Sequence, residues 1–80
     1  MNFIDDLKTR LVEIMEAFEA DAAPEKVKSA LQQLLDEATL WKMDLIDEPD
    51  LMAELNALIA KIKQAKIEVF NVYANNSNNV

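Results

Sequence analysis

The segment "AAPEKVKSALQQLLDEATLWKMDLIDEPDLM", residues 22–52, contains both prolines of an 80-residue chain that has no glycine. Proline is tolerated in the first turn of an α-helix, because its missing N–H has no partner to lose there. Glu25 and Asp50, which directly follow Pro24 and Pro49, suit the positive end of a helix dipole. The two prolines therefore predict two helix starts, and they divide the chain into three segments.

Apolar residues between the prolines alternate between spacings of four and three, which is typical of a helix with one buried face. These residues are Val27, Leu31, Leu34, Ala38, Trp41 and Leu45. We expect a helix over about 24–46, with Trp41 as an anchor in its core. The indole N–H of such a residue needs a hydrogen-bond partner when it is buried.

The same spacing continues in the two flanking segments, at Ile4, Leu7, Leu11, Ile14 and Phe18, and at Leu51, Leu55, Leu58, Ile62, Ala65, Val69 and Val72. It predicts helices over about 2–20 and 49–74. Short connections make consecutive helices antiparallel. The expected fold is all-α, a three-helix up-down-up bundle in which helices 24–46 and 49–74 form a long hairpin. We expect one domain over 1–74 and a disordered tail over 75–80, because the tail has weak helix formers and nothing to bury.

The composition excludes several classes of protein. Cysteine and histidine are absent, which removes disulfides, thiolate nucleophiles, Cys/His zinc sites and imidazole bases. A net charge of -7 argues against direct binding of nucleic acid, which requires clustered Lys and Arg. No apolar run approaches the roughly 18 residues of a membrane span, and the N-terminus has acids where a signal peptide is basic. We expect a cytoplasmic protein that binds neither nucleic acid nor membrane.

The acidic stretch "MDLIDEPDLMAEL", residues 43–55, is the candidate for a metal site. A calcium loop places acids at alternate positions and follows them with a glycine, and this stretch does neither. We interpret it as a bend in which Asp47 or Glu48 caps the third helix. Neighbouring carboxylates on helix 24–46 have no nucleophile–base pair beside them. The sequence therefore predicts no catalytic residue, no metal site and no cofactor.

Charged residues gather in two other places. Acids lie on the side of helix 2–20 opposite its apolar stripe, with Asp6, Glu13, Glu16 and Glu19 as a candidate face for a basic protein partner. Such a row can be a solvated surface, or it can imitate phosphates and occupy the basic groove of a nucleic-acid-binding protein. In the run "KIKQAK" we expect Lys61, Lys63 and Lys66 to pair with acids of the neighbouring helix.

Helices 24–46 and 49–74 have more apolar residues than one bundle can turn inward. The surplus comprises Leu35, Leu40, Met43 and Ile46 on the first, and Ile59, Ile67, Phe70 and Tyr73 on the second. Contiguous apolar surface marks interfaces, and a bundle of this size gains stability by self-association. We expect a homo-oligomer, a dimer or higher, with a self-interface made by Leu55, Ile59, Ile62, Ile67, Val69, Phe70 and Tyr73.

These features favour a small acidic helical protein that is not an enzyme, that self-associates and that acts by binding a protein partner. One alternative is an acidic nucleic-acid mimic that inhibits a DNA- or RNA-binding machine. Another is a small-molecule site between subunits, because an oligomer interface can enclose what one bundle cannot. The apolar surface could also be a groove for the helix of another protein.

Overall fold

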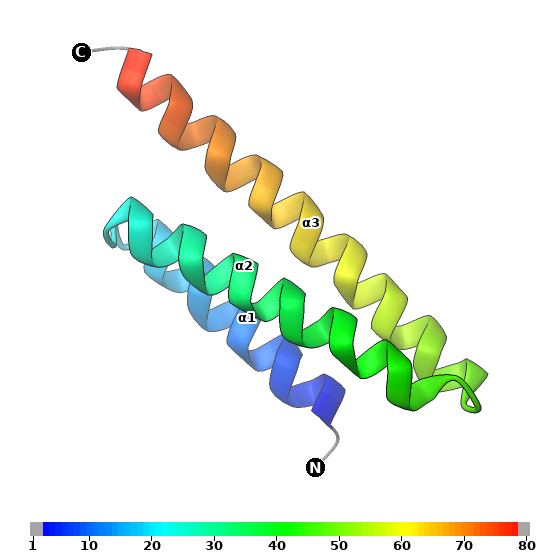
Figure 1. Cartoon of the computed structure of the whole chain (residues 1–80). Helices are drawn as coiled ribbons and strands as arrows, with labels where there is room; N and C mark the ends of the chain where they lie inside the picture. The colour runs from blue at the N-terminus through cyan, green and yellow to red at the C-terminus, as the bar shows by residue number, and fades with distance from the viewer. Residues whose placement is uncertain (1–2, 79–80) are drawn as a thin grey trace.

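The computed structural model describes residues 3–78 of the chain. Its elements are α1 (Phe3–Glu19), α2 (Pro24–Trp41), the 3-10 helix η1 (Lys42–Leu45) and α3 (Pro49–Asn78). Within residues 3–78 there is no strand, so the predictions of an all-α fold and of three α-helices are confirmed. In Figure 1 the chain passes along α1, reverses, returns along α2 and reverses again before α3.

The longest element is α3, whose 30 residues span about 45 Å at the rise of an α-helix. Its C-terminal end extends past the turn between α1 and α2 (Figure 1). The helix includes residues 75–78, where we expected a disordered tail. No glycine or proline interrupts this segment, and each residue added to an existing helix gains a backbone hydrogen bond. Residues 79 and 80 of the predicted tail lie outside the described residues.

The core lies between the three helices and consists of two clusters of buried side chains. The first joins Ile4, Leu7, Leu34, Ala38, Leu45, Leu55, Leu58, Ile59 and Ile62. The second joins Val27, Leu31, Ala65 and Val69, against which Met15, Phe18 and Ala22 pack. No polar or charged residue among those described is buried. Stability therefore comes from apolar packing among all three helices, with α2 and α3 in direct contact and α1 packed on both.

The turn after α1 contains a residue in the left-handed conformation, Asp21, whose φ is 62°. Its N–H donates to the carbonyl of Phe18 at 3.2 Å, and the N–H of Ala22 donates to the carbonyl of Ala17 at 3.0 Å. These two bonds form a Schellman motif, in which glycine usually takes the left-handed position. Because this chain has no glycine, aspartate occupies it, and aspartate tolerates this conformation better than most residues.

We expect Asp21→Gly to raise the free energy of unfolding by roughly 0.5–1 kcal/mol, because glycine adopts a positive φ without steric cost. Asp21→Val should lower it by about 1–2 kcal/mol, because a β-branched residue is strained in this region. Urea denaturation of the two variants beside the wild type measures both effects. A loss of stability in Asp21→Gly would contradict the assigned turn geometry.

The acidic stretch forms the connection between α2 and α3. We predicted that the second helix would reach residue 46, but α2 ends at Trp41 and the chain tightens into η1. The tighter winding brings Leu45 into the core and leaves Ile46 exposed. The carbonyl of Glu48 accepts the N–H of Met52 at 2.9 Å, which begins α3 with Pro49 in its first turn. Within residues 3–78 the acids do not gather into a group of three that could hold a metal ion.

Candidate interaction surfaces

The outer side of the α2–α3 pair combines exposed apolar and basic side chains. Ile67 is 56% exposed and Phe70 is 40% exposed. Beside them is a hollow of about 360 Å³, which is lined by Leu35, Lys63, Lys66, Ile67 and Phe70. We call these five residues, together with Lys28, the basic–apolar face.

The ring of Phe70 lies near two ammonium groups. Lys28 Nζ is 5.2 Å from the ring centroid, and Lys66 Nζ is 5.6 Å from it. Lys28 Nζ is also 5.7 Å from the centroid of Tyr73. Cations at such distances are attracted to the face of an aromatic ring. Lys66 also donates a hydrogen bond to the side chain of Gln32 on α2. These contacts fix the position of Phe70 on the surface.

Among residues 3–78, the lysines of α3 form no ion pair with an acid, contrary to our prediction. The one ion pair among the described side chains joins Arg10 of α1 to Glu37 of α2. Lys66 instead contacts Gln32 and Phe70, because the α2 residue opposite it is an amide. Asp36, one turn along α2, accepts a hydrogen bond from Gln32 Nε2 at 3.0 Å. The basic–apolar face is therefore locally positive on a chain whose net charge is -7.

The residues predicted for self-association separate into two groups. Leu55, Ile59, Ile62 and Val69 are buried within the core of their own chain, so they have no free surface to offer a second copy. Their prediction as interface residues is wrong, because α1 and α2 already cover them. Ile67 and Phe70 are exposed, and Tyr73 is half-buried. The structure thus leaves Ile67, Phe70 and part of Tyr73 accessible.

Tyr73 packs edge-to-face on Phe18, with ring centroids 5.5 Å apart and an interplanar angle of 89°. Its hydroxyl is buried and has no hydrogen-bond partner among the described residues. We expect Tyr73→Phe to raise the free energy of unfolding by about 1 kcal/mol, because it keeps the ring contact and removes an unsatisfied polar group. Thermal and urea denaturation test this. A clear loss of stability would show that the hydroxyl has a partner in solution.

All four residues of the predicted acidic row, Asp6, Glu13, Glu16 and Glu19, are exposed on α1. The sequence interpretation missed Val12, which is 56% exposed. Positions 12, 16 and 19 fall on one side of a helix, so Val12 shares a stripe with two of the glutamates. The sequence did contain a signal for Val12, because it is an apolar residue at a position outside the spacing of the buried residues. We call these five residues the acidic face.

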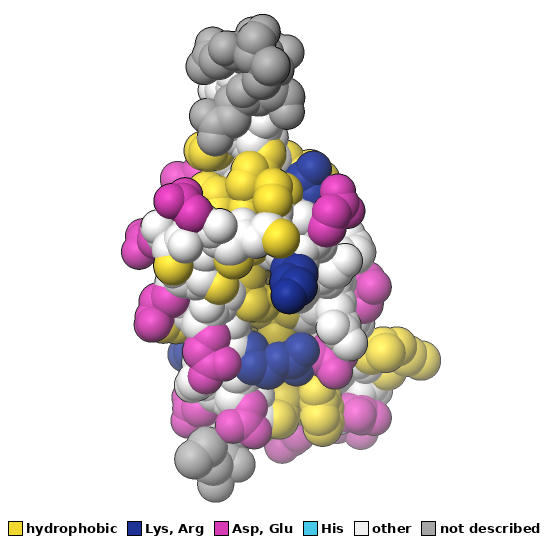
Figure 2. Space-filling model, turned by 90° about the vertical axis from the view of Figure 1, so that its left-hand side faces the viewer, with side chains coloured by type: hydrophobic (Ala, Val, Ile, Leu, Met, Phe, Trp, Pro, Cys, Tyr) yellow, Lys and Arg dark blue, Asp and Glu magenta, His cyan; other side chains and the backbone are white. Residues whose placement is uncertain are grey.

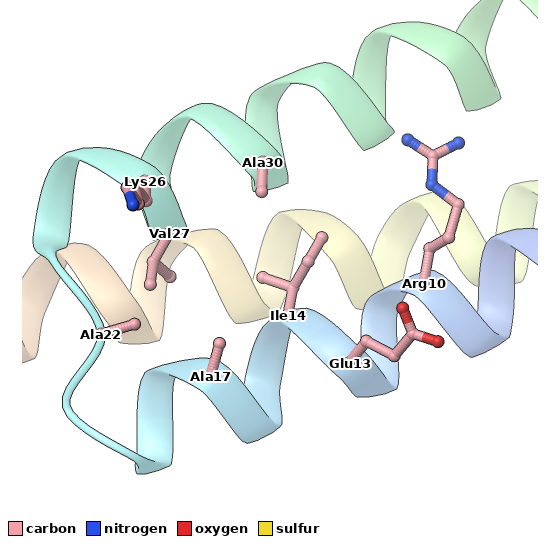
Figure 3. Close-up of a pocket in the computed structure, with 8 residues that line it drawn as sticks. All are labelled: Arg10, Glu13, Ile14, Ala17, Ala22, Lys26, Val27 and Ala30. Atoms are coloured by element: carbon pink, nitrogen blue, oxygen red, sulfur yellow. The ribbon is translucent and has the colours of Figure 1, made fainter.

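A second hollow lies between α1 and α2 (Figure 3). It holds about 350 Å³ and is lined by Arg10, Glu13, Ile14, Ala17, Ala22, Lys26, Val27 and Ala30. The three alanines leave the space open, and Ile14 and Val27 make it apolar. Seen from the side of the α1–α2 turn, the molecule shows hydrophobic side chains with Lys and Arg among them along its middle, and acids along both edges (Figure 2). Sequence reasoning placed such a cavity only between subunits, although alanines on facing helices could have indicated it.

Trp41 was predicted as a core anchor, but it is 38% exposed. Its ring stacks on Phe3, with centroids 4.1 Å apart. The buried positions near this end of α2 belong to Ala38 and Leu45. Because η1 begins directly after Trp41, the change in helical winding leaves the indole at the edge of the bundle.

Comparison of the chain with models of protein families, with curated proteins and with solved structures finds no match. Within the described part of the chain, no helix combines the length and the hydropathy that crossing a membrane requires. Functional inference therefore depends on the three surfaces described above.

Proposed function

We propose that this protein is a non-catalytic helical interaction protein that associates with itself and with a protein partner through the basic–apolar face. In this proposal the helices pack up-down-up, and α2 and α3 form one continuous antiparallel surface. The observation that carries the proposal is the exposure of Ile67 and Phe70 beside a hollow that lysines border. Interfaces are enriched in aromatic residues at their centre and have polar rims.

The size of this surface indicates weak association. Complete burial of an exposed Ile or Phe side chain contributes about 1.5–3 kcal/mol. Phe70 already has more than half of its surface covered, since it is 40% exposed, so it contributes less than that. Association also costs translational and rotational freedom. We therefore expect assembly that depends on protein concentration.

Light scattering across a concentration series tests the proposal. We expect the wild type to rise above its monomer mass of 9.1 kDa, and Phe70→Glu to remain monomeric because it places a charge in the contact. Ala57→Glu is the matched control, since it introduces the same charge at an exposed position of α3 outside the face. A monomeric wild type at every concentration would overturn self-association through this face.

The hollow between α1 and α2 favours a second candidate function, binding of a small apolar molecule. Its volume of about 350 Å³ lies in the range of ligand sites, and its floor is apolar. We expect native mass spectrometry to detect adducts of the wild type with an added aliphatic carboxylic acid, and to lose them in Ala30→Leu, which fills the hollow. Ala60→Leu on exposed α3 surface is the control. Equal binding by both variants would reject this site.

A further inference from the structure

Charge is distributed unevenly between two faces of this molecule. Between Glu54 and Glu68, α3 contains three lysines and no acid. The acidic face of α1 carries exposed Glu13, Glu16 and Glu19 around Val12. Each of the two faces thus has an apolar centre. The charges around it are basic on one face and mainly acidic on the other, where exposed Lys8 lies one turn before Val12.

Pairing the basic–apolar face with the same face of another copy would bring lysines together. Like charges across an interface oppose association, and opposite charges favour a specific partner. No ion pair among the described residues neutralises Lys28, Lys63 or Lys66. We infer that the acidic face of α1 from a second copy covers the basic–apolar face. This inference rests on the proposed function and names the surface that binds there.

The spacing of the charges on the two helices is compatible with this contact. Lys63 and Lys66 are three residues apart, as are Glu13 and Glu16, so each pair rises about 4.5 Å along its helix. A neighbouring α1 that lies along the hollow can place its glutamates against the lysines. Val12 then contacts the apolar centre formed by Ile67 and Phe70. When Glu19 and Lys28 are included, three glutamates of one copy face three lysines of the other.

The two faces lie on opposite sides of the bundle. The apolar stripe of α1 packs on α2 and α3, so Val12, Glu16 and Glu19 point away from them. Glu13 lies at the edge of the acidic face and also lines the α1–α2 hollow. The hollow of the basic–apolar face is lined by α2 and α3 alone. One neighbour therefore cannot engage both faces of a copy. An assembly of any length has an unoccupied acidic face at one end and an unoccupied basic–apolar face at the other. Head-to-tail contacts of this kind extend unless they close into a ring.

Two full-length double variants test the inference by light scattering. Lys63→Gln/Lys66→Gln neutralises one face, and Glu13→Gln/Glu16→Gln neutralises the other. Each alone should associate on the order of tenfold more weakly than the wild type, as expected for two lost exposed ion pairs. Lys61→Gln and Glu68→Gln, exposed elsewhere on α3, are the controls and should behave as the wild type. An equal mixture of the double variants should form a complex that stops at two chains, because only one intact pair of faces remains.

The outcomes separate this inference from the proposed function. Normal association of Glu13→Gln/Glu16→Gln, with Phe70→Glu monomeric, would overturn the inference and leave the proposed function intact. Failure of the mixture to form a complex would also overturn it. A wild type that is monomeric throughout would reject both. Circular dichroism of every variant confirms that a loss of association is not a loss of fold.

Discussion

The Leu34→Ala variant is expected to lose roughly 2–5 kcal/mol of its free energy of unfolding. Leu34 is fully buried on α2 and belongs to the cluster in which α1, α2 and α3 meet. Truncation removes apolar contacts and leaves a cavity that closely packed neighbours cannot fill. Because small domains have about 5–15 kcal/mol of stability in total, the loss should appear as a large shift of the urea midpoint.

Leu40→Ala is the matched control, because it makes the same change on the same helix. Leu40 is 65% exposed, so its truncation should change stability by no more than about 0.5 kcal/mol. Equal losses in the two variants would show that α2 does not present Leu34 to the core. If Leu34→Ala changes the m-value, the slope of the free energy of unfolding against urea concentration, and not the midpoint, unfolding is no longer two-state.

Helix starts could be predicted from the sequence, whereas the ends of α2 and α3 could not. Both α2 and α3 begin at the prolines that were expected to begin them, because proline constrains its own backbone and needs no distant partner. The end of α2 depends on how η1 brings Leu45 into the core, which is a tertiary effect. The extension of α3 through residues 75–78 likewise follows no local signal, since weak helix formers there predicted a tail.

Periodicity predicted which residues share a face, but it did not show what covers that face. Leu55 and Ile62 follow the expected spacing, and the structure covers them with the chain's own helices. The contacts of Lys66 depend on the register between α2 and α3, which places it opposite Gln32. A shift of one turn would place it opposite Asp36 instead. Side-chain packing sets that register. The sequence alone therefore did not show that the lysines of this face have no acid opposite them.

The Leu55→Glu variant is expected to be largely unfolded. Leu55 is fully buried, and no polar or charged residue among those described is buried beside it. An unpaired carboxylate at this position should cost about 4 kcal/mol or more, which approaches the whole stability of many small domains. Far-ultraviolet circular dichroism at 25 °C should therefore show a strong loss of helix.

Ile67→Glu makes a comparable change on the same helix at a side chain that is 56% exposed. It should keep its helix content and lose self-association, because its carboxylate remains in water in the monomer and enters only the intermolecular contact. The two variants together distinguish the core side of α3 from its interface side. A folded, monomeric Leu55→Glu would reverse that assignment, because only a residue at the surface of the single chain can accept a charge and still weaken association.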